Sequence, residues 1–381
     1  MIMNSKERHE KRFQRRKAKR LEKRRKMQEM YGDFEKIFTF DNLYNAFTKC
    51  KKGVMWKSST KKYRANLSRN TYDIYKQLKD GKYKSKGFYE FDLVERGKLR
   101  HIKSVHISER CVQRTLCDES LVPLVERGLI YDNGASMKNK GIDFALNRIE
   151  AQLRRHFRKY GNDGYILQFD FKGYFENIDH RIIDEILRRI YPDKRTYRIA
   201  SHFVNNFGEK GLGLGSQVSQ ILAIAVPNKI DHFIKEELKI KGYGRYMDDG
   251  YLIHYSKEYL KECLVKIRVK LIEYGIKLNE KKTQIVKISH GFTFLKAKHY
   301  LLPSGRIIKK PCRKSIVTMR RKLKKFKKND KIEFNDVLTS LTSWIGHMKR
   351  YDSYKSVVNM KKLFNELYVD CWMKEWREVY V

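Results

Sequence analysis

Two stretches of apolar and aromatic residues that run into aspartates constrain the fold of this chain most. Residues 164–171 (Gly-Tyr-Ile-Leu-Gln-Phe-Asp-Phe) predict a β-strand that ends at Asp170. Residues 243–255 predict two further short strands around Asp248, Asp249 and Gly250, because an Asp-Gly pair between such runs indicates a hairpin. If the hairpin lies beside the first strand in one sheet, it brings the three carboxylates together.

Taken singly, these acids have ordinary interpretations: a strand-end cap for Asp170 and a solvated turn for the Asp pair. Gathered together, carboxylates repel one another and are poor structural choices unless cations neutralise them. Oxygen ligands with open positions suit Mg²⁺, which completes its shell with water and phosphate oxygens. Two such ions about 3.5–4 Å apart stabilise the attacking and leaving oxygens of an in-line phosphoryl displacement. The acids therefore point to two-metal phosphoryl transfer.

The charge of the chain indicates the kind of substrate. Its 381 residues include 85 Lys plus Arg against 44 Asp plus Glu, which gives a formal net charge of +41. The natural partner of such a surface is a polyanion. Together with the metal chemistry, this charge favours nucleotidyl transfer on a nucleic acid.

Composition excludes several other classes. Hydrophobic residues make up 41% and aromatic residues 13% of the chain, so disorder of the whole chain is excluded. No apolar run is long enough for a transmembrane helix, and the N-terminus is charged where a signal peptide needs an apolar stretch. We therefore expect a cytoplasmic protein without membrane contact. Six scattered cysteines without a C-x-x-C pair argue against zinc sites and disulfides.

The remaining pattern predicts mostly helices. A strand pair over 88–94 and 99–105 with a turn at 95–98, and a helix over 109–125, come first. Asp179 is the expected N-cap of a helix that stops before Pro192. Later helices are expected after the glycines at 211–215, from Ser256 to Gly275, and from Arg313 onward.

The first 28 residues are rich in charged side chains, most of which are Lys or Arg. A solvated helix and a nucleic-acid-binding arm are both compatible with such a run. The folded body is expected to begin near Tyr31.

The chain resembles the reverse transcriptases in several motifs. Tyr246-Met247-Asp248-Asp249 resembles their Y-x-D-D box, and residues 169–175 resemble their first palm motif. Further segments that match in family order are 98–102, 109–113, 131–141, 214–220, 274–283, 292–295 and 343–347. The resemblance covers roughly residues 38–360. Y-x-D-D alone is a weak signal, whereas the ordered set is a strong one.

The resemblance implies a role for each matching residue. Asp170 and Asp248 hold two Mg²⁺ ions, Asp249 contributes mostly its electric field, and the backbone carbonyl of Phe171 completes one metal shell. Lys282 stands where the family places a proton donor to the leaving pyrophosphate; it could equally be a surface lysine beside Lys281.

Other matching residues are implied to bind the nucleotide. Lys98 and Arg100 contact the incoming triphosphate. Phe175 stands where a ring blocks a ribose 2′-OH, so deoxynucleotides are favoured; a core aromatic is the ordinary alternative. The nucleotide pocket also includes three residues of the middle motif, namely Leu214, Gly215 and Gln220.

That middle motif departs from the common Q-G-x-x-x-S-P form. Here it reads Leu214-Gly215-x-x-x-Ser219-Gln220, which resembles the reverse transcriptases of diversity-generating retroelements. Those enzymes copy a template RNA with errors at adenines and work with a small basic accessory protein. The implied partners are therefore an RNA template and its RNA/DNA duplex, dNTPs, such an accessory protein and a structured non-coding RNA. Anti-phage defence reverse transcriptases, which also depart at this motif, are the alternative.

The implied fold is α+β, the right-hand polymerase architecture with fingers, a palm with a small antiparallel sheet, and a helical thumb. The expected division is a basic extension over 1–30, fingers over 31–160, palm over 161–305 with an interleaved fingers segment near 190–212, and thumb over 306–381. A catalytically silent basic RNA-binding protein of the same fold is a competing hypothesis from another class. The intact aspartates argue against it, as Phe175 argues against an RNA-dependent RNA polymerase.

Overall fold

The computed structural model describes residues 5–95, 97–329 and 331–380, and side chains except those of residues 95, 98, 100 and 370–380. The chain divides into two compact units, each assembled from three separate segments. Unit 1 consists of residues 1–139, 170–239 and 265–279, and unit 2 of residues 140–169, 240–264 and 280–381. Each unit is described by itself.

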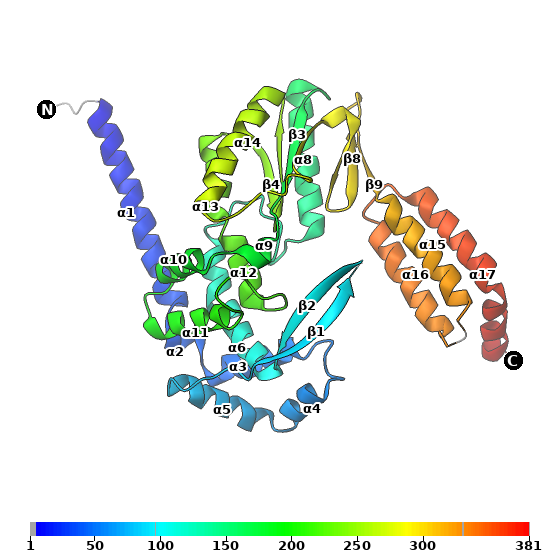
Figure 1. The fold of residues 1–381 in the computed structure, drawn as a ribbon, viewed down its shortest axis with the longest axis horizontal. Coiled ribbons are helices and arrows are strands. Elements are labelled where there is room, and N and C mark those ends of the chain that lie inside the picture. The colour runs from blue at the N-terminus through cyan, green and yellow to red at the C-terminus, as the bar shows by residue number, and fades with distance from the viewer. Residues whose placement is uncertain (1–4, 96, 330, 381) are drawn as a thin grey trace. The chain divides into compact units, whose positions relative to one another are not determined.

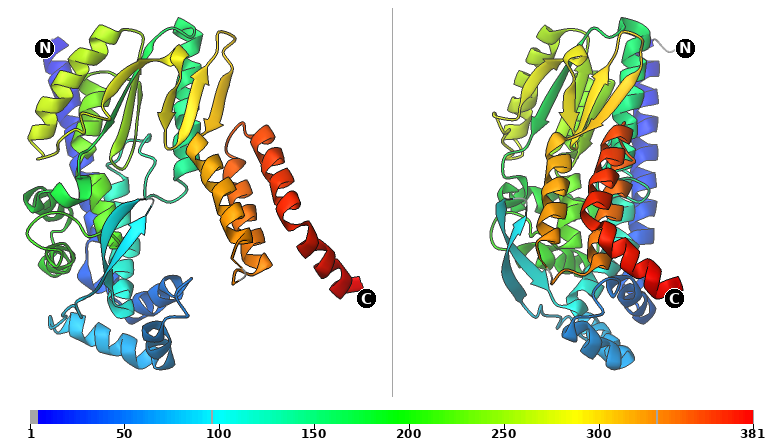
Figure 2. Two further views of the ribbon diagram at one scale, coloured as in Figure 1. Left: turned by 45° about the vertical axis from the view of Figure 1, so that its right-hand side comes forward. Right: turned by 90° about the vertical axis from the view of Figure 1, so that its right-hand side faces the viewer.

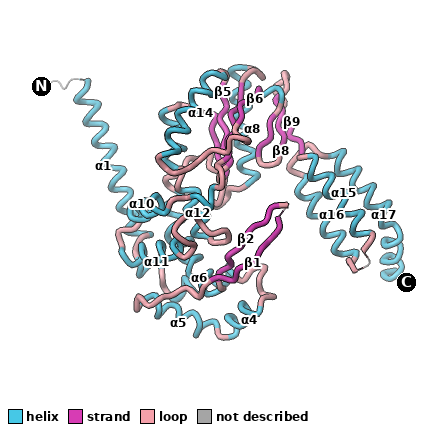
Figure 3. Tube along the Cα trace, viewed as in Figure 1, coloured by secondary structure: helices cyan, strands magenta, loops and turns pink. Residues whose placement is uncertain are grey.

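Unit 1 is mainly helical and contains a single described hairpin. Its helices are α1 (Ser5–Tyr31), α2 (Phe34–Ile37), α3 (Phe40–Cys50), α4 (Ser58–Ala65), α5 (Leu67–Lys79), α6 (Ile107–Leu116), the π-helical η1 (Cys117–Leu121), α7 (Val122–Glu126), α9 (Tyr174–Asn177), α10 (His180–Ile190), α11 (Lys194–Asn205), α12 (Gln217–Ala225), α13 (Asn228–His232) and the π-helical η2 (Phe233–Glu237). Strands β1 (Phe88–Glu95) and β2 (Lys98–Val105) pair antiparallel along their whole length. Figure 3 shows this hairpin among the surrounding helices.

Unit 2 holds the remaining strands in two sheets. Their bounds are β3 (Tyr165–Asp170), β4 (Gly242–Tyr246), β5 (Asp249–His254), β6 (Gln284–Lys287), β7 (Phe292–Phe294), β8 (Ala297–Leu301) and β9 (Ile307–Pro311). The first sheet has the order β4-β5-β3-β6 and the second the order β7-β8-β9. The last residue of β3, Asp170, begins a segment of unit 1.

Helices of unit 2 cover these strands and build a separate bundle. They are α8 (Ile142–Tyr160), the short 3₁₀ turn η3 (Ile288–His290), α15 (Arg313–Lys327), α16 (Phe334–Met348) and α17 (Tyr354–Tyr380), while α14 (Lys257–Ile272) runs from unit 2 into unit 1. Apolar side chains of α8, including Leu146, Ile149 and Leu153, share one core with Ile166 of β3 and Tyr251 of β5.

The three C-terminal helices lie side by side around a core of their own, in both views of Figure 2. Leu323 of α15, Leu341 of α16 and Met360 of α17 are buried in it. The basic side chains of α15 stay on its exposed side, since this helix buries only Met319 and Leu323. Among the described residues, none of the helices combines the length and the apolar character that crossing a membrane requires.

Most of the expected elements are confirmed. The predicted strand pairs form, and so do the helices after Arg313. Asp179 caps α10 by accepting from the Arg181 amide, and this helix ends before Pro192. The expected α+β fold with small antiparallel sheets is also confirmed. The helix expected over 109–125 begins at Ile107 instead, because the ring of His106 caps it by accepting from the Ser108 amide.

Two expectations were wrong in detail. The helix expected after the glycines is interrupted: α12 ends at Ala225 and α13 begins after Pro227, because proline cannot supply the amide that a continuous helix needs. The Asp-Gly pair is not the hairpin turn. Tyr246 pairs with Asp249, so the turn residues are Met247 and Asp248, and Gly250 lies within β5.

Candidate active site

The hairpin β4–β5 presents two of the candidate carboxylates. Because Tyr246 pairs with Asp249, its turn has two central residues, Met247 and Asp248. Met247, the first central residue, has a φ of +54°, which both type I′ and type II′ turns require there and which glycine or asparagine usually supplies. A methionine at this position strains the backbone, and the surrounding structure must hold the residue in this conformation.

A buried arginine stabilises this strained turn. Arg245 of β4 is 1% exposed, and its Nη1 donates to the Met247 carbonyl oxygen at 2.8 Å. The adjacent Asp248 and Asp249 are half-buried. A guanidinium fixes the position of the turn that carries these acids, and with it the direction in which they project.

Strand β3 packs closely against β5. A Cβ atom on Gly250 would lie 2.2 Å from Cζ of the Phe169 ring, so only glycine allows this approach. Asp249 and Asp170 are the chain neighbours of these two residues. The glycine of the Y-x-D-D-G segment therefore serves the contact between two strands rather than the turn.

Asp170 itself is held by an asparagine. Its carboxylate is buried at 5% exposure, and Oδ1 accepts from Nδ2 of Asn279 at 3.1 Å. The Asn279 amide also donates to the Asp170 carbonyl oxygen at 2.7 Å. Phe171 forms an isolated antiparallel bridge with Leu278. Residues 278–279 thus fix both the backbone and the side chain at the end of β3.

The donor chemistry fits magnesium. Asp170, Asp248 and the Phe171 carbonyl offer only hard oxygen ligands. No group of three or more His, Cys, Asp or Glu side chains able to hold a metal occurs in the part of the chain that the structure describes. Mg²⁺ is commonly bound through one or two carboxylates, with water and substrate phosphates completing the shell, so this donor set is sufficient.

Phe175 lies in the short helix α9, beside the glycine-rich segment. Its ring is half-buried and meets Tyr174 edge-on at 5.8 Å between centroids. The Leu212 amide donates to the Phe175 carbonyl oxygen at 2.6 Å. A Cβ on Gly211 would lie 2.9 Å from the same oxygen, so the segment can approach α9 only with glycine there.

The middle motif continues from this contact into α12. Leu214 is half-buried, whereas Gly215, with a φ of +102°, and Gln220 are exposed. Ser216 caps α12 by accepting from the Ser219 amide, and its hydroxyl donates to Gln113 Oε1 at 3.1 Å. The Gly215 position also lies against strand β2, since its Cβ would be 3.9 Å from the Lys103 carbonyl oxygen. The motif therefore belongs to one assembly with α6 and β2.

The structure describes the positions of the other candidate lysine and arginine residues only in part. Lys98 and Arg100 lie on β2, paired with Glu95 and Leu93, and their side chains lie outside the described part of the structure. Lys282 is exposed in the turn before β6.

Comparison with known proteins identifies the family. The family model described as reverse transcriptase (RNA-dependent DNA polymerase) matches residues 79–299, more than half of the chain. The chain belongs to the reverse transcriptase family. The expectation of an RNA-directed DNA polymerase is confirmed at this level. The matched range contains all three aspartates and every other candidate site residue of this reverse transcriptase.

Two solved telomerase structures are similar to this reverse transcriptase. Apo telomerase from Candida tropicalis, truncated from its C-terminal domain, matches at 14% identity and a TM-score of 0.44, over 58% of this chain and 55% of that one. Telomerase from Candida albicans, in complex with a fragment of telomeric RNA, matches at 11% identity and a TM-score of 0.47, over 74% of this chain and 60% of that one. The chain thus spans little more than half of the first. A comparison with curated protein sequences finds no match.

Sequence reasoning missed two positioning residues. The strand pattern predicts Arg245 only as a strand residue, although a charged residue between the strand residues Gly244 and Tyr246 is itself a signal of a buried partner. In the sequence, Asn279 is only one residue within the matching segment 274–283. Its contact with Asp170 spans 109 positions, which no local pattern reveals.

Proposed function

We propose that this chain makes cDNA on an RNA template by two-metal nucleotidyl transfer, with Asp170 and Asp248 holding both Mg²⁺ ions. The observation that carries the proposal is the sheet order, in which β5 lies next to β3, with the Y-x-D-D turn before β5 and Asp170 at the end of β3. When bound, the two ions activate the primer 3′-hydroxyl and stabilise the charge of the leaving pyrophosphate. Asp249 adds negative field, and the Phe171 carbonyl oxygen is available as a further ligand.

The chain's remaining candidate residues have roles in substrate selection and proton transfer. Phe175 excludes a ribose 2′-hydroxyl by volume and offers it no hydrogen-bond partner. Lys98 and Arg100 bind the triphosphate, since guanidinium and ammonium groups suit phosphate oxygens. Lys282 donates the proton that the pyrophosphate takes up on leaving.

The substitution Asp248→Asn tests the proposal. It should abolish Mg²⁺-dependent dNTP incorporation on a primed RNA template, because the amide cannot replace the metal-holding charge. RNA affinity should stay nearly unchanged, because dispersed cations provide it. The matched control is Asp163→Asn, an exposed acid just before the opposite end of β3. Retained polymerase activity in Asp248→Asn would refute the metal assignment. RNA binding without any polymerase activity in the unmodified chain would favour the silent RNA-binding hypothesis.

We further propose that the enzyme is the error-prone polymerase of a diversity-generating retroelement, working with a small basic accessory protein and a structured RNA. The support is the Leu214-Gly215-x-x-x-Ser219-Gln220 motif. A leucine offers bulk but no hydrogen bond beside the nascent pair, and apolar contact alone discriminates by about 1–3 kcal/mol. Anti-phage defence is the alternative purpose.

The fidelity of Leu214→Gln tests this finer proposal. The variant should make fewer errors than the unmodified chain on one adenine-containing RNA, as counted by sequencing the cDNA. Equal error spectra, or an unmodified enzyme already as accurate as ordinary reverse transcriptases, would refute the subfamily assignment and leave the polymerase assignment intact.

The polymerase assignment carries a proposed division of the chain. Residues 1–30 form a basic extension, 31–160 the fingers, 161–305 the palm with fingers residues near 190–212, and 306–381 the thumb. The three-helix core of α15, α16 and α17 supports the last boundary.

A further inference from the structure

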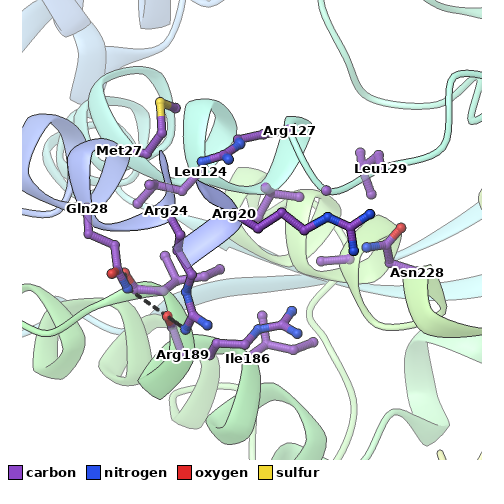
Figure 4. Close-up of a pocket in the computed structure, with 14 residues that line it drawn as sticks. Arg20, Arg24, Met27, Gln28, Leu124, Arg127, Leu129, Ile186, Arg189 and Asn228 are labelled. Atoms are coloured by element: carbon purple, nitrogen blue, oxygen red, sulfur yellow. Dashed lines mark hydrogen bonds between the residues drawn. The ribbon is translucent and has the colours of Figure 1, made fainter. Parts of the chain in front are cut away.

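Unit 1 contains a cavity of about 310 Å³ between helices α1, α7, α10 and the start of α13. Figure 4 shows four arginines around it: Arg20 and Arg24 from α1, Arg127 after α7, and Arg189 near the end of α10. Arg20 points toward Asn228, and Arg24 toward Arg189. No acidic residue is among the side chains that line this cavity.

Helix α1 is fixed over the cavity although none of its residues is buried. Gln28 Nε2 donates to the carbonyl oxygens of Arg189 and Ile190 at 2.8 and 3.1 Å. Arg24 donates to the Arg189 carbonyl oxygen as well, and Arg127 donates to that of Lys23 at 2.8 Å. The bonds from Gln28 and Arg24 satisfy the last carbonyl groups of α10 and hold α1 beside the cavity, where the side chains of the four arginines remain exposed.

The four guanidinium groups are not compensated by carboxylates. Within the described ranges, no Asp or Glu pairs with Arg20, Arg24, Arg127 or Arg189. Carbonyl oxygens at a helix end carry only partial charge, so the formal charges remain. Partial burial, and then the charge of the neighbouring Arg189, lower the pKa of Arg24.

The neighbouring arginines on the same helices behave differently. Arg25 pairs with Glu29 at 2.8 Å, and Arg188 pairs with Asp184 at 2.6 Å. The chain therefore neutralises the adjacent arginines and leaves those at the cavity without an acid. Guanidinium groups that no carboxylate neutralises are available to bind a phosphate.

The rest of the cavity is apolar. Met27, Leu124 and Ile186 contribute side chains to its wall, and Asn228 has an inaccessible Oδ1 without a hydrogen-bond partner. The volume is near the lower end of the range for small-molecule sites, roughly 300–1,000 Å³. Arginines beside an apolar wall and an amide suit a ligand with a phosphate and a flat heterocycle.

We propose that this cavity binds one nucleotide, its phosphate held by Arg24, Arg189 and Arg20 and its base against the apolar wall beside Asn228. The nucleotide is either free or part of a single RNA strand that continues along α1. The site goes beyond the proposed polymerase function, because none of the residues assigned to catalysis lines it.

The test compares two double variants of equal charge in the full chain. Arg24→Gln/Arg189→Gln removes the cavity cations, and Arg25→Gln/Arg188→Gln removes their paired neighbours. The probes are an unstructured twelve-nucleotide RNA by fluorescence anisotropy over a salt series, and adenosine monophosphate and inorganic phosphate by thermal shift. Melting without ligand is recorded first, and we expect only a small change of Tm in the cavity variant, because it loses the Arg24 bond to the Arg189 carbonyl oxygen but also a charge repulsion, and Gln28 still holds α1 to the end of α10.

The affinity of the cavity variant for RNA should fall on the order of tenfold or more, because each charge-assisted hydrogen bond to a phosphate that is lost weakens binding. Its salt slope should fall by about 0.7–1.4, one or two phosphate contacts. The control should stay within about twofold of the unmodified chain. If adenosine monophosphate raises Tm in the unmodified chain alone, the site takes free nucleotides. If only the RNA arm responds, the nucleotide belongs to a strand.

Equal losses of RNA affinity in both variants, without any nucleotide-dependent shift in Tm, would overturn the proposal and make these arginines part of a general basic surface. Failure here is distinguishable from failure of the polymerase assignment. The cavity variant should keep dNTP incorporation at saturating template, whereas Asp248→Asn should keep the cavity binding.

Discussion

Two hairpins of this chain carry candidate site residues in opposite surroundings. In β1–β2, two strands of eight residues form a sheet by themselves, and Tyr89, Val94 and Leu99 are each about two-thirds exposed or more. In β4–β5, Tyr243, Tyr251 and Leu252 are buried and the hairpin is part of a four-stranded sheet, with β4 at the edge and β5 between β4 and β3. An isolated two-stranded sheet is only marginally stable, whereas a packed one is rigid.

The difference matches the two kinds of group that the hairpins carry. Metal-holding carboxylates must be placed accurately, because an error of about 1 Å can cost ~100-fold in rate. Lysine and arginine reach a phosphate on long side chains and tolerate movement of the backbone beneath them. We therefore expect β4–β5 to be sensitive to small steric changes and β1–β2 to be tolerant of them.

The largest effect should come from matched alanines at two glycines. Gly250→Ala brings a Cβ within 2.2 Å of the Phe169 ring, whereas Gly97→Ala, at a φ of +81°, meets no atom within 4 Å. We expect the first to lower the free energy of unfolding by about 1–3 kcal/mol and to abolish activity. The second should strain only its own turn, by about 1–2 kcal/mol, with the global Tm retained. Denaturant unfolding and primer extension measure both. Equal effects would mean that the hairpins do not differ in rigidity.

A smaller effect is expected from the arginine that supports the β4–β5 turn. Arg245→Met removes the donor to the Met247 carbonyl oxygen, so the turn loses its support. We expect kcat to fall by about 10–100-fold while the KM for dNTP changes little, because positioning rather than binding is lost. Arg245→Lys should restore only part of the rate, since an ammonium lacks the planar fork. A change confined to KM would contradict this role.

On the exposed hairpin β1–β2, substitutions should weaken the binding of dNTP. Lys98→Gln/Arg100→Gln should raise the KM for dNTP on the order of tenfold, because charge-assisted bonds to the triphosphate are lost. Tm should not change. The control is Lys103→Gln on the same strand, whose ammonium lies over the Phe88 ring instead. If KM is unchanged in the double variant, β2 does not contact the triphosphate.

The smallest effect should be a pH dependence of the exposed hairpin alone. Hydrogen bonds with Asp92 and then Glu90 raise the pKa of His101. The protonated His101 therefore stabilises the β1–β2 hairpin below the ordinary pKa of histidine, and this stabilisation is lost as the pH rises through the raised pKa. Burial lowers the pKa of His254 in β5, which is therefore already neutral in that range. Hydrogen exchange, corrected for intrinsic rates, should show β1–β2 amides losing protection as pH rises. His101→Gln should remove the trend, and β4–β5 should not show it.

The sequence predicted local features well. Runs of apolar and aromatic residues located β3 and β4–β5, and the side-chain chemistry of Asp179 predicted a cap that the structure contains. It failed where a distant contact decides. The Asp-Gly pair has the chemistry of a turn, yet Gly250 is required by the Phe169 ring, which belongs to another strand. Likewise, the role of Asn279 depends on Asp170, 109 positions away, whereas the bond from Arg245 to Met247 is local and its signal is only the charged residue in a strand.

The division of the chain has a consequence for its synthesis. Because the segments of the two units alternate along the sequence, the chain enters each unit three times. Proteins generally fold domain by domain as the ribosome delivers them, N-terminal part first. Here unit 1 lacks its last segment until residue 279 has been added, and the last segment of unit 2 begins only after that. Helices of the first segment, such as α3 and α6, can pack on one another early, but a fragment ending before residue 279 would complete neither unit.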